Sequence, residues 1–127
     1  MRLLSLLLLV LGLSCSQNSA NAQNKRSPDV FEAMLRLDST IQLVDVRTPE
    51  EFKSGHIAKA QNLNIQSADF VKKISQLDKN RPVLVYCAVG GRSANAASQF
   101  SALGFTKVYD LKGGITAWKS AGKAVEK

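Results

Sequence analysis

The chain has 127 residues, of which 45% are hydrophobic and 21% charged, and this balance excludes a disordered or fibrous protein. Its 17 lysines and arginines outnumber its 10 aspartates and glutamates, but they are scattered and lack interleaved aromatic residues, which argues against nucleic-acid binding. The length suits one small domain behind a short N-terminal extension.

The N-terminus has the pattern of a secretory signal peptide. A positive charge precedes an apolar run over residues 3–13, which is too short to span a bilayer. Ala20 and Ala22 then provide the small-x-small pattern that signal peptidases accept. We therefore expect residues 1–22 to be removed and the protein to be exported, to the periplasm in a bacterium.

A second interpretation of this segment concerns Cys15. In a lipoprotein, the cysteine of the Ser14-Cys15 pair would become a lipidated N-terminus and anchor the protein to a membrane. Otherwise no membrane association is expected. Cleavage after Ala22 removes Cys15 and leaves Cys87 without an internal disulfide partner.

The remaining chain alternates between helical and strand patterns. In chain order we expect a polar linker over 23–26, a helix capped by Ser27, a strand over 41–46, a helix capped by Thr48 and ended by Gly55, a strand over 60–63, a helix over 67–77, a strand over 82–86, a helix over 93–103, a strand over 108–111 and a helix over 115–120. The alternation predicts an α/β domain with a mostly parallel sheet.

Chemistry is expected at Cys87, which directly follows the clearest strand. In open parallel sheets, ligands bind beyond the carboxyl ends of the strands. Gly90 and Gly91 let the loop turn several backbone N–H groups toward one point, and the start of the next helix and Arg92 add positive charge. These features favour a thiolate at Cys87, and they would equally stabilise a persulfide.

Three segments resemble the rhodanese family. The loop Cys87-Ala88-Val89-Gly90-Gly91-Arg92-Ser93 is similar to the rhodanese active-site loop, and residues 43–52 with 55–57, and residues 111–118, are similar to two further family segments in the same order. The resemblance implies a rhodanese domain over 27–127, with a sheet of about five strands flanked by helices on both faces.

The resemblance also implies an activity. Cys87 would take a sulfane sulfur from a small donor such as thiosulfate and pass it to a thiol or cyanide-like acceptor, with no metal or organic cofactor, and we expect a monomer. The residues that would bind the substrate complete the loop: Ala88, Val89, Gly90, Gly91, Arg92 and Ser93. For Arg92 we expect the guanidinium or the backbone N–H to hold an anion.

Several other residues have less direct expectations. Asp45 and Arg47 lie in or just after a buried strand, so we expect an ion pair or a hydrogen bond that supports the loop from behind. His56, the only histidine, is expected to fix the chain rather than act as a base, while Phe52 and Trp118 are expected in the core.

Two positions depart from the family pattern. Lys59 and Asn64 stand where the family usually shows a glycine and a proline. Because they lie away from the Cys87 loop, the departure concerns local backbone geometry rather than the chemistry.

Two other functions compete with sulfur transfer. A phosphatase or arsenate reductase uses a Cys…Arg loop for oxyanions, but such loops have five residues between the two, and here there are only the four from Ala88 to Gly91. A non-catalytic module that binds sulfur or a partner is the other alternative, although inactive members of the family commonly lose the cysteine.

Overall fold

The computed structural model of the protein describes residues 24–127. The expected signal peptide, its cleavage site after Ala22 and the alternative lipid attachment at Cys15 therefore lie outside the described residues. Among the helices that are described, none has the length and apolar character needed to cross a bilayer.

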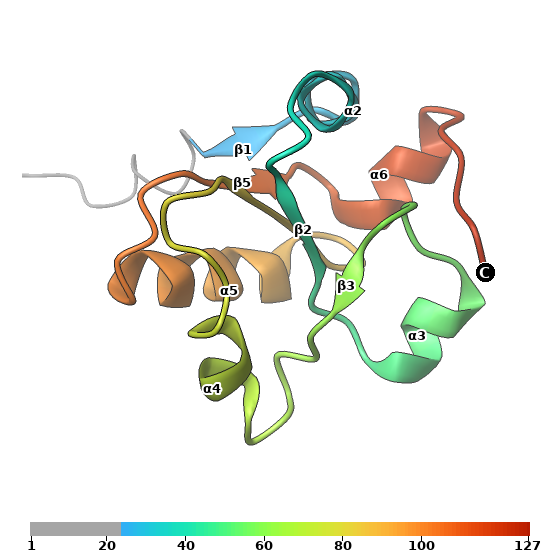
Figure 1. The fold of residues 1–127 in the computed structure, drawn as a ribbon. Coiled ribbons are helices and arrows are strands. Elements are labelled where there is room, and N and C mark those ends of the chain that lie inside the picture. Colours follow the sequence, from blue (N-terminus) through green and yellow to red (C-terminus); the bar gives the residue numbers. More distant parts are fainter. Residues whose placement is uncertain (1–23) are drawn as a thin grey trace, which may run out of the picture.

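One five-stranded sheet forms the centre of the domain (Figure 1). Its strands are β1 (Lys25–Arg26), β2 (Gln42–Asp45), β3 (Gln61–Asn62), β4 (Val83–Tyr86) and β5 (Val108–Leu111). They are ordered β1-β5-β4-β2-β3, and every pairing is parallel. The predicted α/β class with a mostly parallel sheet is confirmed, and within the described residues the sheet is parallel throughout.

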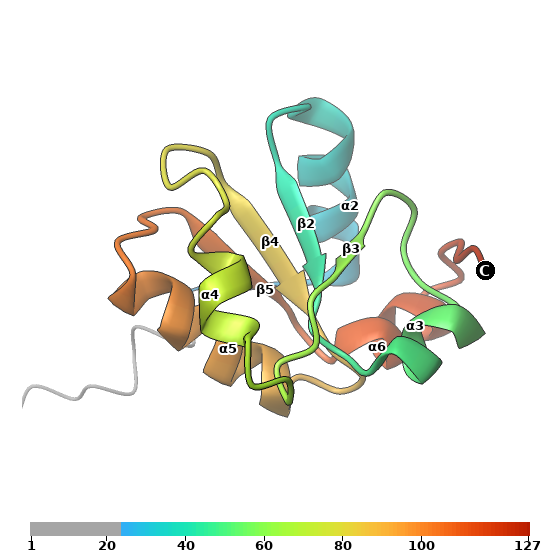
Figure 2. The ribbon, with the colours of Figure 1, turned by 60° about the horizontal axis from the view of Figure 1, so that its bottom comes forward.

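Helices cover both faces of this sheet. They are α2 (Pro28–Leu37), α3 (Pro49–Ser54), α4 (Phe70–Ile74), α5 (Gly91–Ala102) and α6 (Gly114–Ser120). Figures 1 and 2 show α2 and α6 on one face and α4 and α5 on the other. The sheet therefore has two apolar cores, one on each side.

The central strand β4 contributes alternate residues to the two cores. Val83 and Val85 pack on the α4 and α5 side, and Leu84 and Tyr86 on the α2 and α6 side. Cys87, the next residue, continues this alternation and packs with the α5 core. The alternation of side chains along β4 therefore places the Cys87 sulfur on the side of the sheet that α5 covers.

The structure corrects several predicted boundaries. The expected linker contains β1, which pairs with β5 through Asp110 and Leu111. The helix predicted over 67–77 is only Phe70–Ile74, because the Ser67 side chain bonds Asp69 in a preceding turn and Asp69 makes no side-chain cap. Helix α5 begins at Gly91 rather than at residue 93, so Arg92 belongs to its first turn.

Candidate active site

The sulfur of Cys87 lies under the loop that joins β4 to α5. Cys87 is 1% exposed, and the backbone N–H of Gly90 donates to its Sγ at 3.0 Å. Gly90 reaches this position with φ +121°, in the region that favours glycine. Because the sulfur also sits at the N-terminal end of the 12-residue helix α5, negative charge on it is stabilised.

Ser93 provides a second contact to the sulfur. It is fully buried in the first turn of α5, and its Oγ accepts from the Cys87 thiol at 3.3 Å while donating to the carbonyl of Gly90 at 3.2 Å. A hydroxyl can rotate, so the same Oγ can donate to a thiolate or to a persulfide. The structure thus brings together Cys87, Gly90 and Ser93, three of the residues expected in the site, while their roles in substrate binding stay a prediction.

Helix α6 holds the loop from behind. The N–H of Ile115 donates to the carbonyl of Cys87 at 2.9 Å, and the N–H of Thr116 to that of Ala88 at 3.1 Å. Gly114 permits this approach, since a Cβ on it would lie 2.5 Å from the carbonyl carbon and oxygen of Ala88. Residues 111–118 were identified only as a segment similar to the family, so this contact with the cysteine backbone was not predicted.

Arg92 forms an ion pair with Glu51, a residue that was not expected in the site. Its guanidinium binds both oxygens of Glu51, at 2.7 and 2.9 Å, which joins the start of α5 to α3. Arg92 and the hydrogen bonds from Thr48 hold the pKa of Glu51 down at about 2, against the cost of burial. The role of Arg92 in holding an anion stays a prediction, because its side chain already has an anionic partner.

Nothing in the spacing of the sequence pairs Glu51 with Arg92. Thr48 was predicted to cap this helix, and in the structure it forms a capping box with Glu51 in the first turn of α3. The sequence does not show that α3 lies beside the start of α5, and this tertiary arrangement is what brings Glu51 to Arg92.

Asp45 and Arg47 form the predicted ion pair. Nη2 of Arg47 lies 2.7 Å from Oδ2 of Asp45 and donates to the carbonyl of Gly55 at the same distance. Both side chains are buried, and Asn62 donates to the carbonyls of both residues. The pair thus ties the end of β2 to the end of α3, the helix that carries Glu51, and supports the site indirectly.

The rim of the loop is apolar. Val89 is 69% exposed, Ala88 is half-buried and Gly91 is exposed. These three residues bring no charge to the exposed part of the loop.

A buried carboxyl lies on the far side of the same loop. Asp110 is 2% exposed, and neither of its oxygens has a hydrogen-bond partner among the described residues. Its nearest counter-charge is Lys25, with Nζ 3.7 Å from Oδ2, and burial raises its pKa although Ser93 and Lys25 act in the opposite direction. Neither residue was predicted in the site: Lys25 lay in the expected linker and Asp110 in an expected strand.

His56 is held by backbone and ring contacts. Its Nδ1 lies 2.9 Å from the carbonyl oxygen of Phe52, its ring stacks on that of Phe52, and its backbone pairs with Glu126. These contacts agree with a role in fixing the chain. Trp118 is in the core as predicted, but Phe52 is only half-buried, because it covers His56 instead of entering the core.

Lys59 shows the cost of departing from the family pattern. Its φ is +69°, the one non-glycine positive value among the described residues. This conformation suits the glycine expected at that position. Asn64 adopts a local turn in which its Oδ1 accepts from the N–H of Gln66.

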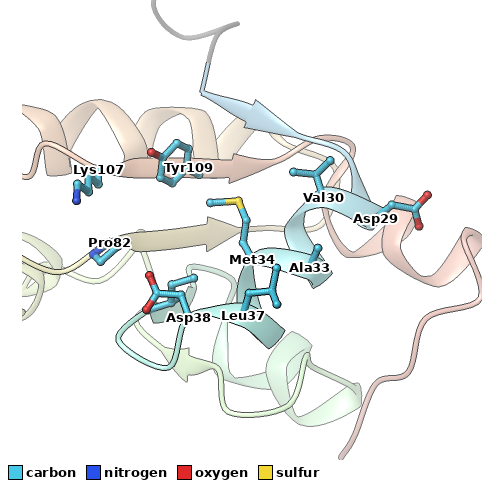
Figure 3. A pocket seen from close by; sticks show the side chains of 10 residues that line it. Asp29, Val30, Ala33, Met34, Leu37, Asp38, Pro82, Lys107 and Tyr109 are labelled. Carbon is cyan, nitrogen blue, oxygen red and sulfur yellow. The ribbon is translucent and has the colours of Figure 1, made fainter.

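A groove in the described part of the chain lies elsewhere. It has a volume of about 580 Å³ and lies between α2 and the neighbouring strands, where Met34, Leu37 and Tyr109 line it (Figure 3). No loop residue from Cys87 to Ser93 contributes to it. Among residues 24–127, no three histidine, cysteine, aspartate or glutamate side chains gather in a way that would hold a metal ion.

The arrangement around Cys87 suits a nucleophile that must also carry a small anionic group. A backbone N–H, a hydroxyl and a helix N-terminus face the sulfur, which is what a thiolate or a terminal persulfide sulfur requires. A phosphatase would need its arginine for the phosphate, whereas the guanidinium of Arg92 is occupied by Glu51. The short loop and this ion pair both disfavour phosphatase chemistry.

Comparison with known proteins agrees with the geometry. A family model described as Rhodanese-like domain matches residues 27–121. The chain is 42% identical over 82 residues to thiosulfate sulfurtransferase GlpE of Shewanella oneidensis, covering 65% of this chain and 79% of that one. It is 34% identical over 113 residues to thiosulfate sulfurtransferase 18 of Arabidopsis thaliana, covering 80% and 83%.

A solved structure shows the same fold. The crystal structure of a rhodanese-related protein from Thermoplasma volcanium has a TM-score of 0.72 to this chain at 29% identity, covering 81% of this chain and 97% of that one.

Proposed function

Because this chain belongs to the rhodanese-like domain family, we propose that it is a sulfurtransferase in which Cys87 carries sulfur as a persulfide. The observation that carries the proposal is the hydrogen-bonded sulfur of Cys87 at the start of α5, which accepts from the N–H of Gly90 and donates to the hydroxyl oxygen of Ser93. The names of the relatives in Shewanella oneidensis and Arabidopsis thaliana support the same reaction class.

The reaction takes place in two displacements. The Cys87 thiolate attacks the outer sulfur of a donor, so that a new S–S bond forms, the donor's S–S bond breaks and the donor leaves with the bonding electron pair. With thiosulfate the leaving group is sulfite. A thiol or cyanide-like acceptor then attacks the outer sulfur of the persulfide, and Cys87 is released as a thiolate.

The loop contributes stabilisation rather than proton transfer. The N–H of Gly90 and the hydroxyl of Ser93 bind the sulfur in its anionic states, and Ile115 and Thr116 keep the loop carbonyls turned away from it. His56 is bound to Phe52 and Glu126, so no histidine base enters the mechanism.

Mass spectrometry tests the proposal. Incubation of the full chain with a sulfane donor is expected to add one sulfur atom, and dithiothreitol is expected to remove it. Cys87→Ser should abolish the gain, whereas Cys15→Ser, which changes the other cysteine, should retain it. A Cys87→Ser protein that still transfers sulfur would refute the mechanism.

We also propose that the protein works outside the cytoplasm after cleavage behind Ala22. The apolar run over 3–13 and the residues at the cleavage site support export. N-terminal sequencing of the processed protein is expected to begin at Gln23 and fractionation to place it in the soluble periplasmic fraction. A membrane-bound protein beginning at a modified Cys15 would establish the lipoprotein alternative instead.

A further inference from the structure

The two-residue strand β1 places a lysine on the face of the sheet that α5 covers (Figure 1). In its parallel pairing with β5, Lys25 stands in register with Asp110, and the carbonyl of Asn24 accepts from the N–H of Asp110 at 2.9 Å. Val108 packs on the α5 side, so Asp110, two residues farther along β5, faces the same side. The register of β1 therefore directs Lys25 toward α5 as well.

The ammonium of Lys25 approaches the loop that holds the sulfur of Cys87. Its Nζ lies 4.0 Å from the position that a Cβ on Gly90 would take, and the N–H of the same glycine donates to the Cys87 sulfur at 3.0 Å. A single residue of the loop thus separates the positive charge from the sulfur. Over so short a path the field of the ammonium passes partly through protein and is incompletely screened by solvent.

Three ion pairs surround Cys87, and two of them are tight. The pairs are Arg92 of α5 with Glu51 of α3, at 2.7 and 2.9 Å, Arg47 with Asp45 at the end of β2, at 2.7 Å, and Lys25 of β1 with Asp110 of β5, at 3.7 Å. On the other helices that pack nearby, Lys72 and Lys73 of α4 and Lys119 of α6 are exposed, so solvent screens their charges. Burial raises the pKa of Tyr86 on β4, which keeps its phenol neutral.

The third pair leaves much of the lysine's charge uncompensated. Neither oxygen of Asp110 has a hydrogen-bond partner among the described residues, whereas the guanidinium groups of Arg92 and Arg47 are hydrogen-bonded to their carboxylates. Burial also raises the pKa of Asp110, so this carboxyl holds its proton to a higher pH than an exposed aspartate. Whenever Asp110 is protonated, Lys25 has no anion opposite it in the pair.

From this arrangement we propose that the ammonium of Lys25, carried by β1, stabilises negative charge on the sulfur of Cys87 from behind Gly90. The inference rests on the proposed sulfur transfer at Cys87. Lys25 does not touch the sulfur and acts on it through its field, as a supporting residue. It precedes residues 27–121, the span that the family model matches, so this charge lies outside the part of the chain that the family resemblance covers.

Lys25→Met provides the test, because methionine retains much of the apolar side chain and removes the charge. Iodoacetamide is the probe, since it is uncharged and alkylates the thiolate, and peptide mass spectrometry of the full chain follows its addition to Cys87 over a range of pH. Without the ammonium the sulfur anion is less stable. We expect alkylation at neutral pH to slow about threefold to tenfold, and the pH of half-maximal rate to rise by roughly half to one unit.

Two single variants separate this charge from a general change. Lys25→Arg keeps the positive charge and should retain most of the alkylation rate. Lys79→Met is the matched control at the opposite end of α5, where the Cδ of Lys79 lies 3.9 Å from the position of a Cβ on Gly104. This variant removes an equal charge far from the sulfur and should leave the rate unchanged. Thermal melting of each variant checks that the fold is retained.

A double variant separates a direct effect on the sulfur from the loss of a partner for Asp110. In an Asp110→Asn background no buried carboxylate is left unpaired when Lys25→Met is added. The added change should still slow alkylation of Cys87. If it slows alkylation only when Asp110 is present, the lysine serves to neutralise that carboxyl and the proposal is overturned.

The remaining outcomes are distinct. An unchanged alkylation rate in a folded Lys25→Met protein, or an equal fall in Lys79→Met, would overturn the role of Lys25 while leaving sulfur transfer intact. Thiosulfate is then tested on the original protein. Its failure to add sulfur to Cys87 would overturn the proposed function itself, whatever the alkylation rates.

Discussion

Ile115 donates its backbone N–H to the carbonyl oxygen of Cys87 at 2.9 Å, so the first turn of α6 fixes the backbone of the reactive residue. The contact requires Gly114, which has φ +62° and lies so close to Ala88 that a side chain has no room. The nucleophile is therefore held from two sides, by α5 at its sulfur and by α6 at its carbonyl.

Gly114→Ala should both destabilise the domain and impair sulfur transfer. The added Cβ would meet the Ala88 carbonyl at 2.5 Å, and a left-handed backbone adds strain. We expect a loss of about 2–4 kcal/mol in the free energy of unfolding, measured by urea titration, and slower persulfide formation.

Gly122→Ala is the matched control for that variant. Gly122 has φ +75° but no atom within 4 Å of an added Cβ, so the change introduces the backbone strain without the clash. We expect it to cost about 1 kcal/mol and to leave sulfur transfer unaffected. Equal losses in the two variants would show that the contact with Ala88 is unimportant.

Ser93→Ala should slow persulfide formation without a large change in stability. It removes the hydroxyl that lies 3.3 Å from the Cys87 sulfur, and a hydrogen bond to a charged group contributes roughly 1.5–3 kcal/mol, which corresponds to about a 10- to 100-fold loss of rate. Ser98→Ala, farther along α5, removes a hydroxyl bonded only to the carbonyl of Ala94 and should not affect the rate. Unchanged kinetics in Ser93→Ala would assign the stabilisation to backbone donors alone.

The sequence predicted the α/β fold and the position of the Cys87 loop at the end of β4. Strand β4 was predicted, as was the loop from Cys87 to Ser93 that follows it, but the contact of the Ser93 hydroxyl with the sulfur was not. Such features depend on neighbours in the chain, and local patterns encode them.

Contacts between distant segments were not predictable in this way. The ion pair of Glu51 with Arg92 and the approach of Lys25 to Asp110 depend on how α3 and β1 pack against the site. A two-residue strand such as β1 has no pattern of its own, since its pairing with β5 alone defines it. Phe52 was predicted in the core from its apolar side chain, because the sequence pattern does not reveal that its ring stacks on His56.

Lys59→Gly should stabilise the protein. The left-handed backbone of Lys59, with φ +69°, lowers the stability of the native state by roughly 1–2 kcal/mol through steric strain. Glycine removes this strain and loses a smaller amount of free energy through the entropy of the unfolded chain. A net gain of about 0.5–1 kcal/mol in unfolding free energy is expected from thermal or urea denaturation. Lys59→Ala keeps the strain and serves as the control, so an equal gain in both variants would point to the lysine charge instead.

Asp110→Asn should stabilise the domain in a pH-dependent manner. Burial raises the pKa of the Asp110 carboxyl above the ordinary range of an aspartate, so the native state binds a proton more tightly than the unfolded state, and stability is lost as the pH rises through the raised pKa. Asparagine does not titrate. Its advantage should therefore be absent below about pH 4 and reach about 1 kcal/mol at neutral pH, the scale of one unsatisfied buried polar group.

Unfolding titrations across this pH range provide the measurement, with Asp78→Asn as a control at an exposed aspartate. Lys25→Met should act in the opposite direction at neutral pH, since it removes the counter-charge 3.7 Å from the buried carboxylate. A stability difference between Asp110→Asn and the original protein that does not change with pH would mean that Asp110 holds the same proton in the folded and unfolded states, contrary to the shift that its burial imposes.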